Sequence, residues 1–238
     1  MEALFTSSRR KLAIRLLITI ILSTYALPAS AKQREWSLPL PKIVQQLPTQ
    51  TLTYYRTAPS ATRFEIGGFL VSFGLVFVDQ PLYEWTTNKD CAIANRTWTH
   101  LTNLGDPRFH LAVAMLLGMM GSQLGEDMIY ALGYTGVNTG IIKATTGMSR
   151  PHLHEGTRFI GPTFDERYHG MPSAHTASST AMATVLHEHY PGSGWVLYPL
   201  AGMIGLSRLH LEQHWPSNVV VGAWLGYLST KHYYKLND

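Results

Sequence analysis

The sequence has little cysteine, little charge and no long apolar run. Its 238 residues include one cysteine, Cys91, which excludes an internal disulfide, so packing must hold the fold together. Charged residues make up 14% of the chain and hydrophobic residues 45%, which is enough for a large core. The apolar runs at 66–78, 111–121 and 195–206 are each shorter than the roughly 18 residues of a confident membrane span. We therefore favour a soluble or peripherally attached domain, and an integral membrane domain is the alternative.

The chain also lacks a basic region beyond its first residues. The formal net charge is +4, but residues 1–31 hold four basic side chains and one acidic side chain, and so account for +3 of it. The remaining domain is nearly neutral and has no interleaved basic and aromatic residues. These absences argue against nucleic acid as a partner.

Residues 1–31 have the three parts of a secretory signal peptide. A basic beginning is followed by a short apolar segment, Leu16 to Leu27, and by the small residues Ala29-Ser30-Ala31. We expect cleavage after Ala31 and export to a bacterial periplasm, in a soluble or membrane-associated form. The alternative, an uncleaved anchor, is less favoured because the apolar segment is shorter than about 20 residues.

The remaining sequence predicts an all-α domain after a lead-in segment. Residues 32–62 contain four prolines and predict an extended lead-in. Residues 63–236 show long apolar segments and no strand-like alternation. Gly133, Gly136 and Gly140 recur about once per turn, where we expect a neighbouring helix to approach closely. We expect a single bundle of about six helices, with candidate segments at 64–78, 85–104, 108–123, 126–146, 173–190, 195–206 and 216–233.

Two cations lie seven residues apart in the segment Lys143 to Pro151. On a helix, Lys143 and Arg150 would face the same side, because seven residues make about two turns. Pro151 would end that helix directly after Arg150. The pair is typical of an anion clamp, and two surface cations with extended side chains are the more common alternative.

A second segment, Met171 to Thr176, predicts a helix start. Ser173 is suited to cap a helix, and the free N–H groups of a helix N-terminus favour an oxyanion. His175 would lie in the first turn and face that anion. An ordinary cap with a surface histidine is the alternative.

The third segment, Ser207 to Asn218, is rich in polar groups. Arg208 lies at the end of one candidate helix, and His214 directly precedes the start of the next, which Pro216 marks. Asn218 is four residues after His214, so we expect it to reach back one turn to a ring nitrogen of that histidine. Together the three segments predict a pocket for a phosphate-like oxyanion.

The three segments also match a known signature in order and spacing. The patterns Lys-x6-Arg-Pro, Pro-Ser-x-His and Ser-Arg-x5-His resemble the three motifs of the type-2 phosphatidic acid phosphatase and vanadium haloperoxidase superfamily. In this sequence they occupy 143–151, 172–175 and 207–214. The resemblance implies that residues 63–236 form a helical bundle of that family's type.

The resemblance implies a phosphate site that needs neither a metal nor a cofactor. Lys143, Arg150 and Arg208 would bind the phosphate oxygens and stabilise the transition state. Ser173 and the backbone N–H of Ala174 would add hydrogen bonds. Ala174 replaces the family's usual glycine, and we expect a mild effect because its N–H remains.

The resemblance also assigns the reaction to two histidines. His214 would attack phosphorus and form a phosphohistidine, and His175 would protonate the leaving group and later activate water. Asn218 stands where the family has an aspartate that accepts the Nδ1–H of the nucleophilic histidine. Asparagine offers a carbonyl for this bond but no charge.

These features predict an exported phosphatase acting on a phosphate monoester or a diphosphate. The expected substrate is a phosphorylated lipid or a small phosphate ester, and the composition is compatible with contact with a membrane surface. Two alternatives remain open. One is a vanadium-dependent haloperoxidase, because the same cationic pocket holds vanadate. The other is a catalytically weakened phospholipid-binding member, because Asn218 replaces the usual aspartate.

Overall fold

The computed structural model describes residues 53, 56, 63–87 and 92–237, which all fall in one compact unit of the chain, Trp36–Asp238. The expected signal peptide, nearly all of the lead-in segment and Cys91 lie outside the described residues.

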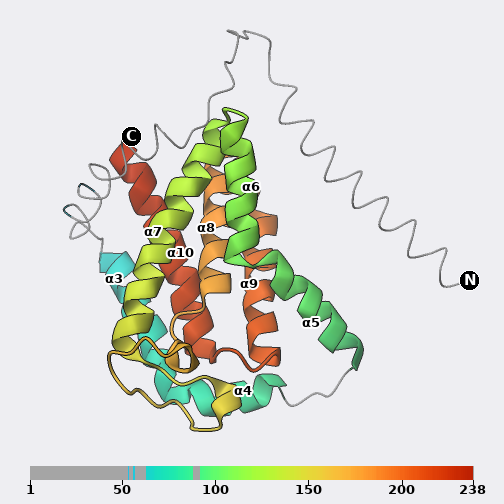
Figure 1. Ribbon diagram of the computed structural model, residues 1–238, viewed down its shortest axis with the longest axis vertical. Helices are drawn as coiled ribbons and strands as arrows, with labels where there is room; N and C mark the ends of the chain where they lie inside the picture. Colours follow the sequence, from blue (N-terminus) through green and yellow to red (C-terminus); the bar gives the residue numbers. More distant parts are fainter. Residues whose placement is uncertain (1–52, 54–55, 57–62, 88–91, 238) are drawn as a thin grey trace, which may run out of the picture. The chain divides into compact units, whose positions relative to one another are not determined.

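The described residues are helical, with one isolated bridge between Met148 and Phe159 and no strand (Figure 1). The fold class predicted from the sequence is therefore confirmed. Within the described ranges, no helix combines the length and apolar character that crossing a bilayer requires. The α-helices are α3 (Arg63–Gly74), α4 (Asp79–Thr87), α5 (Ala92–Leu104), α6 (Pro107–Met119), α7 (Gln123–Thr146), α8 (Ala174–His189), α9 (Gly194–His210) and α10 (Pro216–Asn237). Short 3₁₀ helices span Leu75–Val78, Pro151–Leu153 and Glu166–Tyr168.

Helix α8 is the centre of the bundle and packs against α6, α7, α9 and α10 (Figure 1). All its residues from 176 to 185 are buried, and most are alanine, serine or threonine. These small side chains let neighbouring helices approach closely. A Cβ atom on Gly222 or Gly226 of α10 would collide with the backbone of Ser173 or Ala177. The close α8–α10 contact thus fixes the start of α8 relative to the start of α10.

A buried carboxylate ties three helices together near the start of α7. Asp127 accepts hydrogen bonds from the side chains of Gln123, His189, Tyr233 and Tyr234, at 2.7–3.2 Å. These donors lie on α7, α8 and α10. The network holds the start of α7 in place, and Lys143 lies near the other end of that helix.

The structure corrects the expected helix count and boundaries. The region from residue 63 to residue 104 forms three α-helices, α3, α4 and α5, where two were expected. The number of helices is therefore larger than the predicted number of about six. The expected helix at 85–104 begins only at Ala92, because Trp85 belongs to α4. Asp79 explains the extra helix: it begins α4 and its buried carboxylate is bonded to Ser217 of α10, which sets the position of this turn.

The expected close approach at the glycines of α7 is wrong. A Cβ atom on Gly133, Gly136 or Gly140 would meet no atom of the described residues within 4 Å. These glycines therefore face open space, and the close helix contacts of the bundle occur elsewhere, at positions such as Gly226.

Candidate active site

The three sequence segments converge on one pocket of about 250 Å³. The end of α7, the start of α8, the end of α9 and the loop before α10 meet there. Residues from the start of α6 complete the lining. The lining residues are Asp106, Pro107, Arg108, Lys143, Arg150, Ala174, His175, Arg208 and His214. Of the residues predicted from the sequence, Ser173 and Asn218 are not among them.

Arg150 reaches the pocket by a different route from the expected one. Helix α7 ends at Thr146, and Gly147 then adopts a left-handed φ of +56°. A side chain on Gly147 would collide with the backbone of Gly161, so glycine is required at this turn. Arg150 is extended, as expected for a residue before proline. The prediction of two cations on one helix face is therefore wrong, because Arg150 lies on the loop that follows α7.

Besides Arg108, which pairs with Asp106, three cations line the pocket, and each of them donates to a neutral acceptor. The bonds are Lys143 Nζ to the His169 carbonyl (2.6 Å), Arg150 to Gln213 Oε1 (3.1 Å) and Arg208 to Thr102 Oγ1 (2.6 Å). Within the described part of the chain, none of these cations forms an ion pair. The buried Nε atoms of Arg150 and Arg208 also have no hydrogen-bond partner there. The pocket thus gathers three positive charges and leaves donors available to an anion.

Burial and mutual repulsion lower the pKa values of these groups. Burial, Arg150 and Arg208 together lower the pKa of Lys143 to about 7. Burial and Arg150 lower the pKa of Arg208 to about 10, against an opposing effect of Asp106. Burial also lowers the pKa of Arg150. A bound dianion would oppose these shifts, so the pocket favours an oxyanion such as phosphate.

We expect sulfate to stabilise the protein more at pH 6.5 than at pH 9. The folded pKa of Lys143 lies near 7, below its unfolded value of 10.5, so this lysine loses its charge in the free protein above about pH 7. Between these values the unfolded chain binds more protons, and the free fold gains stability as pH rises. Sulfate keeps its charge throughout and binds the protonated lysine better.

Thermal unfolding with and without sulfate measures this effect. Lys143→Met should remove most of the pH dependence of the sulfate-induced shift. Lys231→Met is the matched control, because Lys231 pairs with Glu188 on another surface and should leave the dependence unchanged. A shift of equal size at both pH values in the wild-type protein would contradict the prediction.

Ser173 caps α8, as the sequence predicted. Its Oγ accepts hydrogen bonds from the backbone N–H and the hydroxyl of Thr176, at 3.4 and 3.0 Å. Ser173 is fully buried, whereas Ala174, the first residue of α8, lines the pocket. In this structure Ser173 fixes the helix start that borders the pocket.

His175 lies in the first turn of α8 and lines the pocket. Burial and the Arg208 charge lower its pKa to about 4, with smaller lowering effects from His110 and Lys143. Asp106 acts in the opposite direction. His175 is therefore neutral at pH 7 in the free protein, and its protonation depends on the charges that enter the pocket.

His214 is buried beside the three cations. Its Nδ1 lies 2.6 Å from the carbonyl of Gly170. A carbonyl only accepts hydrogen bonds, so this contact places the ring proton on Nδ1 and leaves a lone pair on Nε2. Burial, followed by the charges of the neighbouring cations, lowers the pKa of His214 well below its usual range. The ring is thus neutral, with the tautomer that a nucleophilic Nε2 requires.

The hydrogen bonds of the Asn218 side chain go to residues other than His214, which corrects the sequence-based expectation. Its Oδ1 accepts from the backbone N–H of Trp215 (2.9 Å), and its Nδ2 donates to the sulfur of Met148 (3.0 Å). Helix α10 begins at Pro216, so Asn218 is its third residue and its side chain reaches back to cap the helix start. His214 lies before this cap and outside the helix, so the one-turn spacing does not apply. The Gly170 carbonyl accepts the hydrogen bond from His214 Nδ1 that the side chain of Asn218 was expected to accept.

Several supporting residues were missed in the sequence. Asp106 caps α6 and lines the pocket, and the Asp-Pro pair before an apolar segment is a helix-start signal that could have indicated it. Thr102 and Gln213 hold the two arginines. Asp79 is fully buried, and burial raises its pKa to about 6. Nothing in the local sequence indicates the roles of Thr102, Gln213 and Asp79, because their partners are distant along the chain.

Comparison with known proteins gives a consistent assignment. The model of the PAP2 superfamily matches residues 125–238. Lipid A 1-phosphatase from Porphyromonas gingivalis is 38% identical over 71 residues, which are 28% of this chain and 16% of that protein. The chain thus aligns with less than a fifth of the length of this curated relative.

Two solved structures share the fold. LpxE from Aquifex aeolicus aligns with a TM-score of 0.57 and 23% identity, over 66% of this chain and 95% of that one. The first transmembrane PAP2 type phosphatidylglycerolphosphate phosphatase from Bacillus subtilis aligns with a TM-score of 0.56 and 18% identity, over 73% of this chain and 95% of that one. The match to the superfamily model includes all three motifs of the pocket. Residues 125–238, which hold the three motifs of the pocket, are thus similar to the PAP2 superfamily.

Proposed function

We propose that the protein is a metal-independent phosphatase that hydrolyses a lipid-linked phosphate monoester or diphosphate through a phosphohistidine. The observation that carries this proposal is the pocket itself. Three cations that have no ion-pair partner among the described residues lie beside a neutral histidine whose Nε2 is free, and a second histidine lies in the same pocket. Such a site binds a phosphoryl group and offers it a nucleophile.

In the first step, Nε2 of His214 attacks phosphorus and the bond to the leaving oxygen breaks. The Nδ1–H bond to Gly170 orients the ring and stabilises the positive charge that develops on it. In the transition state, negative charge is spread over the three equatorial oxygens of the phosphoryl group. This charge is neutralised by Lys143, Arg150 and Arg208. The cations therefore take the part that a metal ion plays in other phosphatases.

His175 acts on the leaving oxygen. Its low pKa in the free protein is caused by burial and by the nearby cations. The negative charge of bound substrate offsets those cations and raises the pKa, and Asp106 assists. His175 can then protonate the leaving alkoxide, and in the second step it removes a proton from the water that attacks the phosphohistidine. Protonation is thus coupled to substrate binding.

A lipid substrate is supported by the relatives. The names of the curated relative and of the Bacillus subtilis structure both describe phosphatases of phosphorylated lipids. We also propose export to the periplasm, on the basis of the signal-peptide pattern in residues 1–31.

A phosphate-release panel on purified protein tests the proposal. We expect release from phosphorylated lipids, unchanged by EDTA and inhibited competitively by orthovanadate, which when bound can adopt the trigonal-bipyramidal geometry of the transition state. Absence of release from every lipid and soluble phosphate would overturn the proposal. Halide oxidation with peroxide and added vanadate, in place of phosphate release, would assign the haloperoxidase reaction instead.

A further inference from the structure

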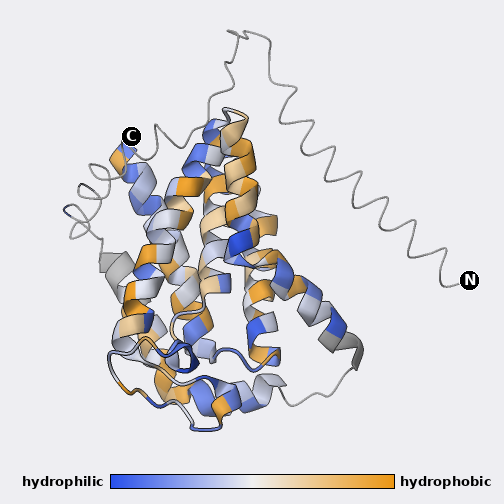
Figure 2. Ribbon diagram, in the orientation of Figure 1, coloured by the Kyte–Doolittle hydropathy of each residue, from blue (hydrophilic) through white to orange (hydrophobic). Residues whose placement is uncertain are grey.

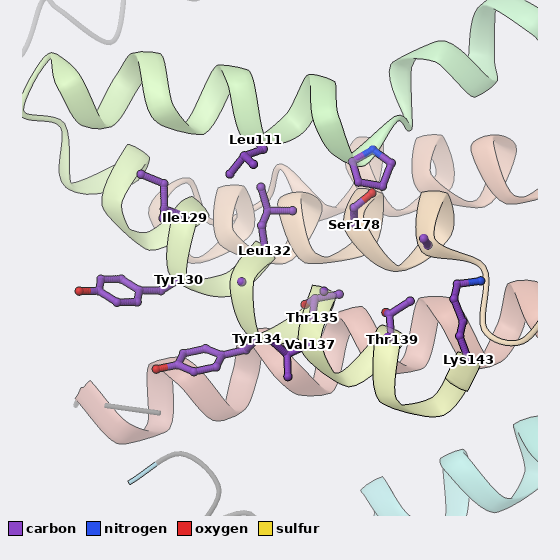
Figure 3. Close-up of a pocket in the computed structure, with 15 residues that line it drawn as sticks. Leu111, Ile129, Tyr130, Leu132, Tyr134, Thr135, Val137, Thr139, Lys143 and Ser178 are labelled. Carbon is purple, nitrogen blue, oxygen red and sulfur yellow. The ribbon is translucent and has the colours of Figure 1, made fainter. Parts of the chain in front are cut away.

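A second and larger cavity, of about 660 Å³, runs along α7 beside the phosphate pocket. It shares Pro107, Lys143 and Ala174 with that pocket, so the two adjoin each other. Its other lining residues are mostly apolar or glycine: Leu111, Ile129, Tyr130, Leu132, Gly133, Tyr134, Thr135, Gly136, Val137, Thr139, Gly140 and Ser178. Figure 3 shows Lys143 at one end of this groove and Tyr130 at the other.

Glycines keep the groove open. Gly133, Gly136 and Gly140 are spaced three and four residues apart and so lie on one face of α7. A Cβ atom at any of them would meet nothing within 4 Å, although all three glycines line the groove. Glycine costs about 1 kcal/mol relative to alanine inside a helix, and no close helix contact compensates for it here. These glycines therefore leave open space beside α7.

Two hydroxyl groups interrupt the apolar wall. Thr135 and Thr139 line the groove and are 2% and 5% exposed, and neither Oγ1 has a hydrogen-bond partner in the described part of the chain. Thr139 is one helical turn from Lys143, and Thr135 is two turns away. An occupant with an oxygen acceptor near its phosphate end, such as an acyl ester, would bond to these hydroxyls.

The length and apolar character of the groove suit the hydrocarbon chain of such an occupant. Lys143 and Tyr130 are thirteen residues apart on α7, which at 1.5 Å per residue gives a length of about 20 Å. Two of the apolar side chains that line the groove are exposed, Leu111 on α6 and Val137 on α7, and α6 and α7 also expose Leu116 and Ile141. Figure 2 shows that most of α6 is apolar. The groove therefore has a cationic end that favours an anion, and it is mostly apolar along the rest of its length.

We propose that the α7 groove holds the acyl chain of the substrate while its phosphate group occupies the cationic pocket. The inference rests on the proposed phosphatase function and adds the path of the chain and the residues that select it. The width of the groove is set by Gly133, Gly136 and Gly140. The hydroxyl of Thr139 donates a hydrogen bond to the acyl ester. The length and bulk of the acyl chain then determine how well it fits along α7, away from the reacting atoms.

Gly136→Leu is the variant that tests the proposal, because its side chain would fill the middle of the groove. The substitution meets no neighbouring atom at Cβ and replaces glycine by a strong helix former, so it should not unfold the protein. Gly202→Leu is the matched control. Gly202 is also an exposed helical glycine with nothing within 4 Å of its Cβ position, but it lies on α9 and does not line the groove.

The ligands are phosphonate analogues of monoacyl lipid phosphates with increasing acyl length, studied by calorimetry below their micelle concentrations. The wild-type protein and Gly202→Leu should gain about fourfold in affinity for each methylene buried. In Gly136→Leu, the ratio of long-chain to short-chain affinity should fall at least about tenfold. An equal gain per methylene in all three proteins, or no gain in any, would overturn the proposal.

Phosphonates are not hydrolysed, so this experiment does not depend on turnover. If chain-length selection is present and is lost in Gly136→Leu while no substrate releases phosphate, the groove assignment stands and the phosphatase function fails. If phosphate is released but chain length has no effect on binding, the groove assignment fails and the phosphatase function stands.

Discussion

His214→Gln is expected to lower phosphate release by about 10⁴-fold or more, because it removes the proposed nucleophile of the reaction. Glutamine keeps a side-chain amide that can donate to the Gly170 carbonyl, so the buried acceptor need not lose its hydrogen bond. The three cations remain, and the variant should still bind phosphate and vanadate. Loss of turnover with retained binding, measured by phosphate release and by calorimetry, would separate the chemical role of His214 from a structural one.

His210→Gln is the control for this substitution. His210 is in the same sequence segment but does not line the pocket, and its ring stacks on Trp98. Its replacement should leave phosphate release close to the wild-type rate. Substantial turnover in His214→Gln would contradict the assigned nucleophile.

Asn218→Asp, which restores the family's usual residue, is expected to destabilise the fold without increasing activity. Asn218 is fully buried, and its Nδ2 donates to Met148 and more weakly to Ser217. A carboxylate would lose both donations and place a second acid near Asp79, which is bonded to Ser217 from the other side. We expect a loss of about 3 kcal/mol, or a decrease in Tm of about 10 °C. No gain in rate is expected, because the His214 Nδ1 is hydrogen-bonded to the Gly170 carbonyl and not to residue 218.

The double variant Asn218→Asp with Asp79→Asn identifies the cause. It contains one buried carboxylate instead of two, so it should recover part of the lost stability. Thermal unfolding of the two single variants and the double variant gives the coupling energy between the sites. A stable and faster Asn218→Asp variant would show that the natural asparagine weakens catalysis and that the capping role is secondary.

The helical fold was predictable because its evidence is local. Apolar segments bounded by Gly, Pro and Asp give the helices, and Ser173 gives the start of α8 directly. The boundaries near α4 were not predictable, since they depend on the contact between Asp79 and Ser217, which are 138 residues apart. The glycines of α7 were misinterpreted because a glycine that admits a neighbouring helix and one that borders a cavity have the same sequence pattern.

The composition of the site was more predictable than its geometry. Motif spacing identified the cations and both histidines, and these residues do meet in one pocket. The spacing between Lys143 and Arg150 suggested a helix that Gly147 ends early. The partner of His214 was also beyond sequence reasoning, because it is a backbone carbonyl, and any residue at position 170 has one.

The most direct test of the account is to identify the phosphorylated residue. The protein is mixed with a lipid phosphate, quenched in base and digested, and the peptides are analysed by mass spectrometry. The account predicts one acid-labile phosphoryl group on the peptide that contains His214, and none in His214→Gln. Steady turnover with no phosphorylated peptide, or with phosphate on a different residue, would contradict it.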